Sequence, residues 1–436
     1  MSKAKNVIDF YLYCDKLTQM IRTGWVKWHV DSDRLESIAE HIYSTSMLAL
    51  GIWSEYDVDI DIEKVMMMLA CHEMEEILIG DKTLFEISRS DKLLEGHEAI
   101  SFLLAPLKRG SQICDLILEF DERESKEARF SFFVDKFQGD IDSKIHDSLG
   151  QIDLNKQEDN EIFYDKRVQK LLQNGNSFSD MWLLFGQQAY HYDGAFLELS
   201  NYVLGHDFIS SDGYMKVVDE GESRSRNVID FYLYCDKLKN TIRKGFLDWH
   251  VDSDRLESIA EHIYGTMMLA LGVWSEYDVD VDIKKVMMML ACHETEEILI
   301  GDKTMFDISR EEKKAIGHEA VTTILSPLRQ GDEIRDLILE FDERESKEAR
   351  FSFFVDKFQF ELKSKIYDSK GCVDLDNQEG NDSFYDERIH SLIEEGKSFS
   401  EMMLLFGQEN YHYDEEFLDL SNYLLKQDFS FVKSKK

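Results

Sequence analysis

The sequence predicts an all-α protein made of two copies of one helical domain. Helix-breaking residues are rare, since only two of the 436 residues are proline and 23 are glycine. Apolar residues also recur at helical spacing through long stretches. The whole pattern then repeats after 221 residues, so that His72-Glu73 returns as His293-Glu294. A period this long indicates a duplicated domain and excludes a solenoid of short repeats.

The two copies are expected to span residues 1–208 and 227–436, joined by a linker over residues 209–226. The segment NVIDFYLYCDKL at residues 6–17 reappears at residues 227–238, and no insertion separates the copies. The linker, ISSDGYMKVVDEGESRSR, is polar and has no counterpart before the first copy. The chain is long and apolar enough for two packed cores.

Each copy is predicted to contain the same series of helices. In the first copy they cover residues 7–22, 35–55, 62–79, 90–104, 113–119 and 125–137, with more helix past residue 143 and a loop at about 155–160. Ser32 or Asp33 is expected to cap the second helix and Asp61 the third, because short polar side chains accept hydrogen bonds from free helix amides. Gly80 and Pro106 are expected to end the third and fourth helices.

Composition limits the partners and the location. The formal charge is −37, which opposes sequence-independent binding to DNA or RNA. None of the six cysteines forms a CxxC pair, so they are expected to be reduced thiols of a cytoplasmic protein. No stretch has the length and apolar character of a membrane span or a signal region. We therefore expect neither a nucleic acid polymer nor a membrane as a partner.

A His-Glu pair at the end of an apolar stretch is the first sign of a functional site. His72 and Glu73 follow such a stretch, and further carboxylates come at Glu75, Glu76 and Asp81. Imidazole nitrogens and carboxylate oxygens are ligands that suit a divalent metal. The alternative for the glutamates alone is a solvated helix face. The second copy carries the same segment, which favours a metal site.

Four polar groups per copy interrupt apolar helical sequence: His41, His72, Glu73 and Asp135, then His262, His293, Glu294 and Asp356. A charged aspartate in such a sequence must be paired or metal-bound, because burying an isolated charge is strongly unfavourable. Two histidines with carboxylates suit Mn²⁺, Co²⁺, Fe²⁺, Ni²⁺ or Zn²⁺. Such an ion lowers the pKa of bound water and polarises a phosphoryl oxygen. Taken singly, His41 fits a structural core histidine, and Asp135 fits an ion pair with Arg129.

The order of these residues resembles the HD-domain metal-dependent phosphohydrolase superfamily, whose signature is H…HD…D. The branch of bacterial and human 5′-deoxynucleotidases is similar in further stretches. These are RTGWV at 22–26, ESIAEH at 36–41, Glu76 with Ile79-Gly80-Asp81, and EARF at 127–130 leading to Asp135-Lys136. The likeness covers most of each copy up to about residue 140. It departs at Glu73 and Glu294, where the signature has aspartate.

The resemblance implies two HD-domain helical bundles, each with one divalent ion (Mn, Co, Fe, Ni, Zn or Mg). The implied ligands are the four residues of each set: His41, His72, Glu73 and Asp135, and His262, His293, Glu294 and Asp356. Glu76 and Glu297 would position or deprotonate the attacking water, and Asp81 and Asp302 would line the site near the sugar. Arg22 and Arg243 would meet the phosphate, and Trp25 and Phe246 would pack on the sugar or base.

The implied reaction is removal of the 5′-phosphate from (deoxy)nucleoside monophosphates by a metal-activated water. Because members of the branch act as homodimers, the tandem chain is expected to form an intramolecular pseudo-dimer, with further oligomerisation open. The second copy reads Arg243-Lys244-Gly245-Phe246 in place of Arg22-Thr23-Gly24-Trp25, so we expect both copies to bind metal but to differ in substrate preference or rate. Two alternatives stay open: hydrolysis of another phosphate, such as a triphosphate or signalling nucleotide, and a non-catalytic nucleotide-sensing module.

Overall fold

The computed structural model describes residues 2–211, 214–219 and 221–429. In these ranges the secondary structure is helical except for isolated bridges and one antiparallel hairpin, formed by β1 (Phe208–Ser211) and β2 (Tyr214–Val217). The prediction of an all-α fold is therefore confirmed. None of the helices in the described part combines the length and apolar character needed to cross a membrane.

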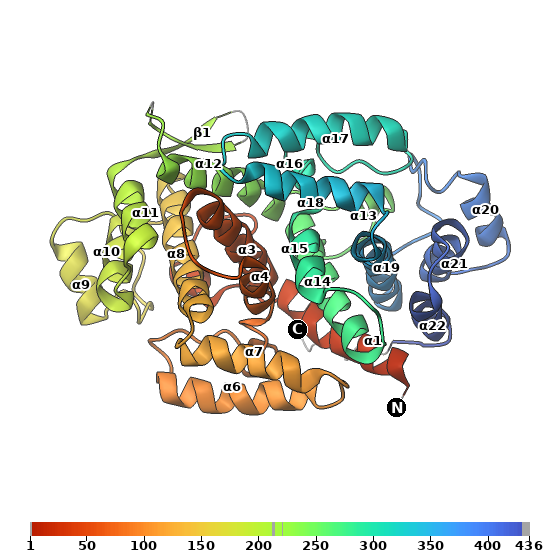
Figure 1. Cartoon of the computed structure of the whole chain (residues 1–436), viewed down its shortest axis with the longest axis horizontal. Helices are drawn as coiled ribbons and strands as arrows, with labels where there is room; N and C mark the ends of the chain where they lie inside the picture. Colours follow the sequence, from red (N-terminus) through yellow and green to blue (C-terminus); the bar gives the residue numbers. More distant parts are fainter. Residues whose placement is uncertain (1, 212–213, 220, 430–436) are drawn as a thin grey trace.

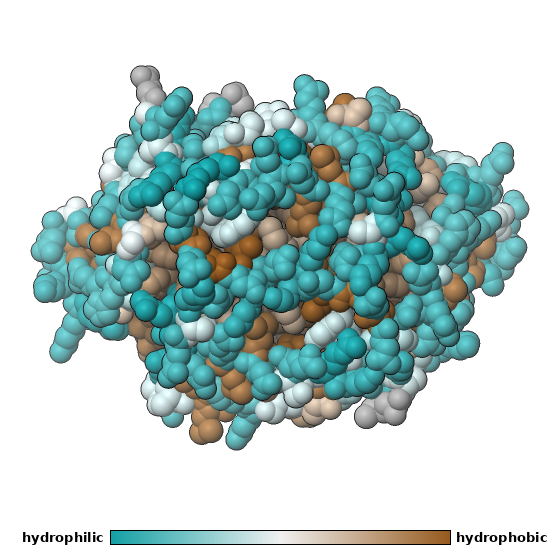
Figure 2. Space-filling model, in the orientation of Figure 1, coloured by the Kyte–Doolittle hydropathy of each residue, from teal (hydrophilic) through white to brown (hydrophobic). Residues whose placement is uncertain are grey.

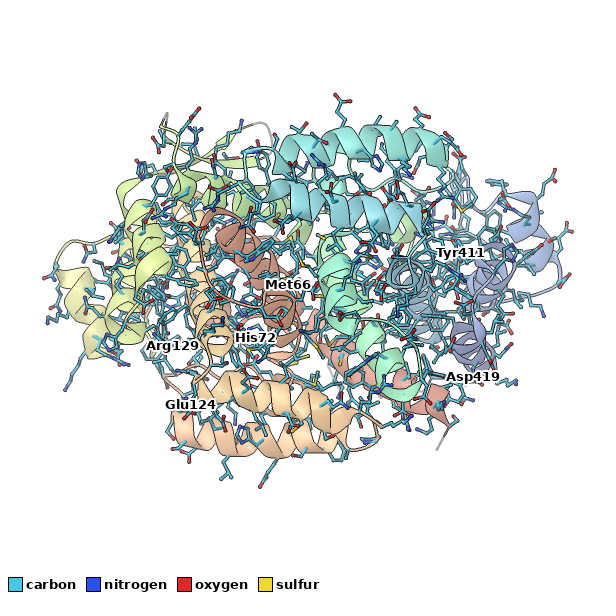
Figure 3. The ribbon with its side chains drawn as sticks, in the orientation of Figure 1. Met66, His72, Glu124, Arg129, Tyr411 and Asp419 are labelled. Carbon is cyan, nitrogen blue, oxygen red and sulfur yellow. The ribbon has the colours of Figure 1, made fainter. Side chains whose placement is uncertain are left out.

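Four helices, two from each repeat, build the centre of the molecule. They are α3 (Ile38–Glu55), α4 (Ile62–Cys71), α14 (Ile259–Glu276) and α15 (Ile283–Cys292). Helix α3 packs against α14 and α4 against α15, so the repeats meet along apolar helices (Figure 1). Met66 on α4 is fully buried near the middle of the molecule (Figure 3). A helix that is apolar on most of its surface has to lie in a core.

The first helix of each repeat packs on the other repeat. Helix α1 (Lys3–Cys14) lies against α14 and against α22 (Glu415–Leu424), whereas α12 (Arg224–Asp236) lies against α3. Gly51 on α3 makes this close approach feasible, because a Cβ there would come within 3.1 Å of the Phe231 ring. One continuous apolar core therefore runs through both repeats.

A buried ionic cluster also joins the repeats at the N-terminal ends of α3 and α14. The guanidinium of Arg34 lies 3.0 Å from Glu40 and 2.9 Å from Glu261 of the other repeat. Arg255 makes the matching contacts, at 2.9 Å to Glu261 and 2.6 Å to Glu40. Both glutamates are almost completely buried, so each charge depends on arginines from both repeats.

The remaining helices surround this centre as two matching sets. In the first repeat these are α2 (Thr23–Lys27), α5 (Glu76–Ile79), α6 (Arg89–Leu104), α7 (Gly110–Glu122), α8 (Lys126–Ser148), α9 (Lys166–Gln173), α10 (Phe178–Tyr190) and α11 (Gly194–Gly205). In the second they are α13 (Lys244–Asp248), α16 (Glu297–Ile300), α17 (Arg310–Leu325), α18 (Gly331–Glu343), α19 (Lys347–Ser369), α20 (Glu387–Glu394), α21 (Phe399–Tyr411) and α22. Short 3₁₀ helices cover Asp15–Thr18 and Lys237–Lys239. Helices α6–α7 and α17–α18 flank the centre on opposite sides, and α9–α11 and α20–α22 form opposite ends (Figure 1).

Several helix boundaries differ from those expected. The helix expected over 62–79 is split, because α4 ends at Cys71 and α5 begins only at Glu76. The helix expected over 7–22 becomes α1 followed by the 3₁₀ turn, and those expected over 113–119 and 125–137 extend to α7 and α8. Asp61 caps α4 and Gly80 follows α5, both as expected. This split matters most for the site, because it places the candidate ligands His72 and Glu73 in the turn between α4 and α5 and not within one continuous helix.

Helix α3 begins at Ile38, later than the expected start near residue 35 with Ser32 or Asp33 as its cap. Ser37 is the cap, and its hydroxyl accepts from the Glu40 amide while the Glu40 carboxylate accepts from the Ser37 amide. The Glu36 carbonyl accepts instead from the Arg22 amide at 3.0 Å, which keeps the segment before Ser37 extended.

The segment expected to be a linker, residues 209–226, contains most of the hairpin and the first turn of α12. Its residues 212–213 and 220 lie outside the described part of the chain, as do residue 1 of the first expected domain and residues 430–436 of the second. The domain boundaries therefore stay a prediction. The face of the molecule in Figure 2 is mostly hydrophilic, with apolar colour mainly in recesses between helices, as expected for so acidic a chain.

Candidate metal centre

Three helical segments bring four predicted residues of the first repeat together. His41 comes from α3, His72 and Glu73 from the turn after α4, and Asp135 from α8. The His41 Nε2 atom lies 3.3 Å from Asp135 Oδ1 and 3.6 Å from Glu73 Oε1. The His72 Nε2 atom lies 3.7 Å from Glu73 Oε1 and 3.9 Å from Asp135 Oδ1. One candidate ligand atom from each residue thus lies within 4.8 Å of all the others.

The second repeat reproduces this arrangement with His262, His293, Glu294 and Asp356. The corresponding distances are 3.2 Å, 3.6 Å, 3.7 Å and 4.0 Å. All eight side chains are buried. The glutamate that replaces the signature aspartate reaches the cluster in both repeats, because the turn after α4 or α15 carries it inward.

Hydrogen bonds at the other ring nitrogen orient each histidine. His41 Nδ1 lies 2.7 Å from the Gln138 side-chain oxygen, and His72 Nδ1 lies 2.6 Å from the Leu69 carbonyl. Because both partners are acceptors, each Nδ1 carries the proton and each Nε2 presents a lone pair to the cluster. These two Nε2 atoms and Asp135 Oδ1 are buried without a hydrogen-bond partner among the described residues. Such unsatisfied lone pairs around one point fit a divalent cation.

The charge states in the cluster also suit a cation. Burial, assisted by the Arg22 guanidinium, lowers the pKa of His41 to about 4. Burial opposes ionisation of Glu73, but Lys92 and His72 outweigh it and lower the pKa of Glu73 to about 2. Near pH 7 this gives a neutral imidazole beside an ionised carboxylate, which is the protonation state that metal ligands require.

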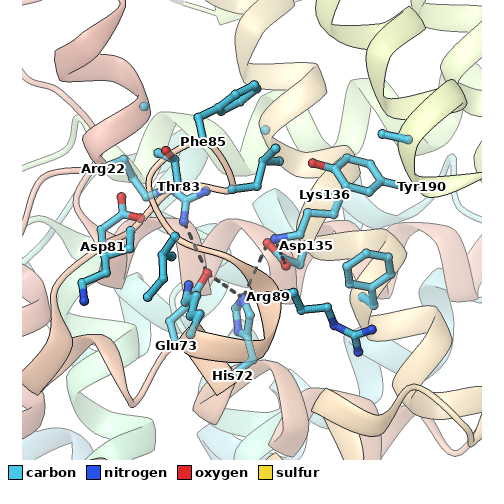
Figure 4. Close-up of a pocket in the computed structure, with 18 of the residues that line it drawn as sticks. Arg22, His72, Glu73, Asp81, Thr83, Phe85, Arg89, Asp135, Lys136 and Tyr190 are labelled. Atoms are coloured by element: carbon cyan, nitrogen blue, oxygen red, sulfur yellow. Dashed lines mark hydrogen bonds and ion pairs between the residues drawn. The ribbon is translucent and has the colours of Figure 1, made fainter. Parts of the chain in front are cut away.

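The carboxylate of Asp135 is stabilised by its neighbours on α8 and α3. Burial again opposes ionisation, but Lys136 at 2.6 Å and His41 hold the pKa of Asp135 well below its usual range. The alternative partner, Arg129, pairs with Asp193 at 3.3 Å instead. Figure 4 shows Lys136 and His72 both directed at Asp135.

Two cationic side chains from different segments of the chain reach the cluster. The Arg22 guanidinium lies 3.4 Å from Glu73 Oε1 (Figure 4). The Lys92 ammonium, on α6, lies 2.8 Å from Glu76 and 4.0 Å from Glu73. Sequence reasoning named Arg22 but missed Lys92, because Lys92 sits in a polar stretch with no motif around it. Lys313 takes the same place in the second repeat, 2.9 Å from Glu297.

Glu76 is the predicted residue best placed to accept a proton. It is 1% exposed, and its Oε2 atom has no hydrogen-bond partner among the described residues. Burial and the nearby Glu73 raise the pKa of Glu76 well above its usual range, in spite of Lys92. Glu297 has the same environment, with a pKa raised by burial and by Glu294.

Asp81 and Asp302 hold a backbone segment, a contact that the sequence did not predict. Asp81 Oδ2 accepts from the Thr23 amide at 2.6 Å, and the Asp81 carbonyl accepts from the Thr23 hydroxyl at 2.9 Å. Asp302 accepts in the same way from the Lys244 amide at 2.6 Å. These bonds fix the start of α2 and α13, the short helices that carry Trp25 and Phe246. Both aspartates also line their pockets.

The first cluster opens into a cavity of about 880 Å³ and the second into one of about 530 Å³. The first is lined by basic side chains from several elements: Arg22, Lys82, Arg89, Lys92, Arg123, Arg129, Lys136 and Arg167. Their concentration counteracts the strongly acidic charge of the chain where an anion has to enter. Most of them are scattered through polar sequence, so no linear motif identifies them.

The two predicted aromatic residues differ in their placement. Trp25 lines the first cavity, and its indole N–H donates to Glu36 at 3.3 Å. Phe246 is completely buried and lies outside the lining of the second cavity. The ring of Phe360 covers it, stacked at 4.9 Å between centroids with an angle of 21° between the planes.

A family model described as an HD domain matches residues 14–178 and 235–392. The chain belongs to the HD domain family. Each matched segment of this tandem HD domain protein contains one complete set of the four clustered residues. Their role as metal ligands stays a prediction that this geometry supports.

Curated relatives of the HD domain protein are 5′-deoxynucleotidases. The 5′-deoxynucleotidase hdd1 of Schizosaccharomyces pombe is 29% identical over 155 residues, which cover 34% of this chain and 76% of the relative. The 5′-deoxynucleotidase HDDC2 of Dictyostelium discoideum is 30% identical over 141 residues, covering 30% and 73%. HDDC2 of Danio rerio is 26% identical over 147 residues, covering 33% and 71%. Each match is thus shorter than one repeat of this chain.

Proposed function

We propose that each repeat is a metal-dependent phosphohydrolase that removes the 5′-phosphate from nucleoside monophosphates, with deoxynucleotides as the preferred class. The observation that carries the proposal is the set of inward-facing, unsatisfied ligand atoms at His41, His72 and Asp135, repeated in the second half. The names of the relatives support the substrate class. In the alternative, the same residues hydrolyse another nucleotide, and only the substrate bound in the cavity differs.

The residues that would hold the ion are His41, His72, Glu73 and Asp135, and their equivalents in the second repeat. A divalent ion held there would polarise a phosphoryl oxygen and make a water molecule more acidic. Any of Mn²⁺, Co²⁺, Fe²⁺, Ni²⁺, Zn²⁺ or Mg²⁺ is compatible with this proposal, and the mixed nitrogen and oxygen donors favour a transition metal over Mg²⁺.

Arg22, Lys92 and Glu76 would supply the rest of the chemistry. Arg22 and Lys92 both lie near the Glu73 carboxylate, so they can hold the phosphate oxygens and neutralise their charge. Glu76 can accept the proton of the attacking water, because it lines the cavity and its buried Oε2 atom has no hydrogen-bond partner among the described residues. Asp81 and Trp25 would form the wall beside the sugar or base.

The tandem chain would act as an intramolecular pseudo-dimer of the two expected domains. Two observations support this proposal: the first helix of each repeat packs on the other repeat, and the ion pairs Arg34–Glu261 and Arg255–Glu40 join the repeats. Free thiols at all six cysteines are compatible with the expected cytoplasmic location. Further pairing of whole chains is left to measurement.

A nucleotide panel tests the proposal. Phosphate release from deoxynucleoside and ribonucleoside monophosphates is measured with Mn²⁺, Co²⁺, Ni²⁺, Zn²⁺ and Mg²⁺ for the wild type and for His72→Ala/His293→Ala. The matched control is His206→Ala, because His206 lies outside both cavities. We expect release by wild type and control only. Release of triphosphate from nucleoside triphosphates, assayed beside the monophosphates, would favour the alternative of triphosphate hydrolysis, and binding without release would favour the sensing module.

A further inference from the structure

The candidate ligands are identical in the two repeats, but one position in the cavity wall differs strongly in the size of its side chain. Residue 139 on α8 is glycine, and residue 360, its equivalent on α19, is phenylalanine. Both line their cavities. A Cβ built on Gly139 would meet nothing within 4 Å, so the space in front of it is open.

This position points along the same side of the helix as a candidate ligand. Gly139 follows Asp135 by four residues, and Phe360 follows Asp356 by four. Residues four apart lie one above the other on a helix. The side chain at 139 or 360 therefore projects next to the cluster, where the part of the substrate beyond the phosphate has to lie.

Phe360 accounts for the changed wall of the second cavity. Its ring stacks on Phe246, and it approaches Gly245 so closely that a Cβ there would lie 3.0 Å from it. In the first repeat a Cβ at Gly24 or Gly139 would meet nothing within 4 Å, and Trp25 itself forms the wall with its ring edge near His146, at 4.7 Å between centroids.

The two cavity volumes differ in the direction expected when phenylalanine takes the place of glycine in the wall. The second cavity, about 530 Å³, is much smaller than the first, about 880 Å³. Another exchange in the cavity wall, from Trp182 to Met403, replaces a large ring by a thinner side chain, so it changes the volume in the opposite direction. Phe360 is thus the substitution that adds most bulk to the wall.

We propose that the residue at position 139 or 360 selects substrates by size: Gly139 lets the first site accept purine and pyrimidine nucleotides, and Phe360 restricts the second site to pyrimidines. This inference rests on the proposed function, since it names the substrate class of the same sites. If so, the two sites of the duplicated chain catalyse the same reaction on different ranges of substrate.

The test uses the full-length chain with one site silenced at a time. His293→Ala leaves the first site to be measured, and His72→Ala leaves the second. Gly139→Phe is added to the first background and Phe360→Gly to the second. The matched control is Gly139→Ala, which adds a methyl group to open space without a ring. The ratio of kcat/KM for dAMP and dGMP to that for dCMP and dTMP is measured for each variant.

We expect Gly139→Phe to lower the purine-to-pyrimidine ratio about tenfold or more and Phe360→Gly to raise it by a similar factor, because a pocket that lacks room for part of a substrate discriminates by at least this much. Gly139→Ala should keep the ratio of its background. The stability of each variant is checked by thermal unfolding. Turnover with unchanged ratios in both exchanged variants would overturn the size selection.

A binding measurement separates this inference from the proposed function. The shift in melting temperature caused by each of the four nucleotides is recorded for the same variants. Purine binding that follows the residue at 139 or 360 without any phosphate release would keep the size selection and overturn the hydrolase. Equal binding of purines and pyrimidines by all variants would overturn the size selection even if turnover were absent.

Discussion

Each of the two repeats contains the same cluster of four candidate metal ligands, but the repeats differ in the charged residues at their mutual contact. In the first, Gln138 donates to Asp142 at 2.8 Å, and Lys239 of the second repeat lies 2.8 Å from the same carboxylate. In the second, residue 363 takes the position of Asp142 and is lysine, paired at 2.5 Å with Asp15 of the first repeat. The position of Lys239 is occupied there by Thr18.

Each of these two ion-pair sites therefore has one buried lysine, and both lysines come from the second repeat while both of the paired aspartates come from the first. A first repeat paired with its own copy would collect Asp142, Glu36 and Asp15 without a lysine, since position 18 is threonine. Burying carboxylates without a cation is strongly unfavourable. The four candidate ligands are thus the same in both repeats, whereas the buried charges at their contact complement each other only between unlike repeats.

The largest effect is expected from the proton acceptor. Glu76→Gln/Glu297→Gln should lower kcat for phosphate release about 10²–10⁴-fold, because an amide cannot accept the proton of the attacking water. Metal content should stay that of the wild type. The control is Glu95→Gln, an exposed residue that pairs with Lys82. An unchanged kcat would remove Glu76 from the mechanism.

The next effect sharpens the comparison of the interfaces. Lys239→Thr should lower the free energy of unfolding by about 3–5 kcal/mol, because it leaves buried carboxylates unpaired. Adding Asp142→Lys recreates the arrangement around Lys363 and should restore most of that loss. Urea denaturation of both variants provides the measurement. A double variant no more stable than Lys239→Thr would show that the two arrangements are not interchangeable.

A smaller effect, on metal affinity, is expected where a residue of one repeat helps to position a candidate ligand of the other. Gln138 orients His41 and also donates to Tyr232 of the second repeat at 2.9 Å. Gln138→Leu should weaken metal binding at the first site about 10–100-fold, because the partner of a ligating histidine fixes its orientation. Tyr232→Phe should have a weaker effect in the same direction. Metal titration of these variants in the His293→Ala background measures the first site alone, and unchanged affinity in Gln138→Leu would contradict the positioning role.

The last prediction concerns the dependence of stability on pH. Burial, together with Glu73 and Glu294, raises the pKa values of Glu75 and Glu296 from 4.5 to about 8. Between about pH 4.5 and about pH 8 the folded protein therefore holds more protons than the unfolded chain. Their contribution to stability is complete below about pH 4.5 and is lost as the pH rises through about 8, with a slope of at most about 1.4 kcal/mol per pH unit for each group.

Urea denaturation in the presence of a chelator, at steps from about pH 5 to about pH 8, measures this loss. Glu75→Gln/Glu296→Gln should show a shallower decrease than the wild type, because glutamine does not titrate. Equal slopes for the two proteins would assign the pH dependence to other carboxylates.

The sequence predicted the helices and the clustered residues because both leave a local signal. A charged residue such as Asp135 stands out in an apolar helix, and the second copy repeats the pattern. Lys92 left no such signal, since a lysine in a polar helix is ordinary and only the fold brings it to Glu76. The covering of Phe246 by Phe360 was equally hidden, because the two residues are far apart in the chain.

The central claim is that each repeat binds one divalent ion through its two histidines and two carboxylates. Metal analysis of the purified chain after loading with Mn²⁺ and removal of excess metal tests it most directly. We predict two ions per chain in the wild type, one in His72→Ala or His293→Ala, and none in the double variant. Metal content that is absent in the wild type, or unchanged by these substitutions in correctly folded protein, would contradict the account.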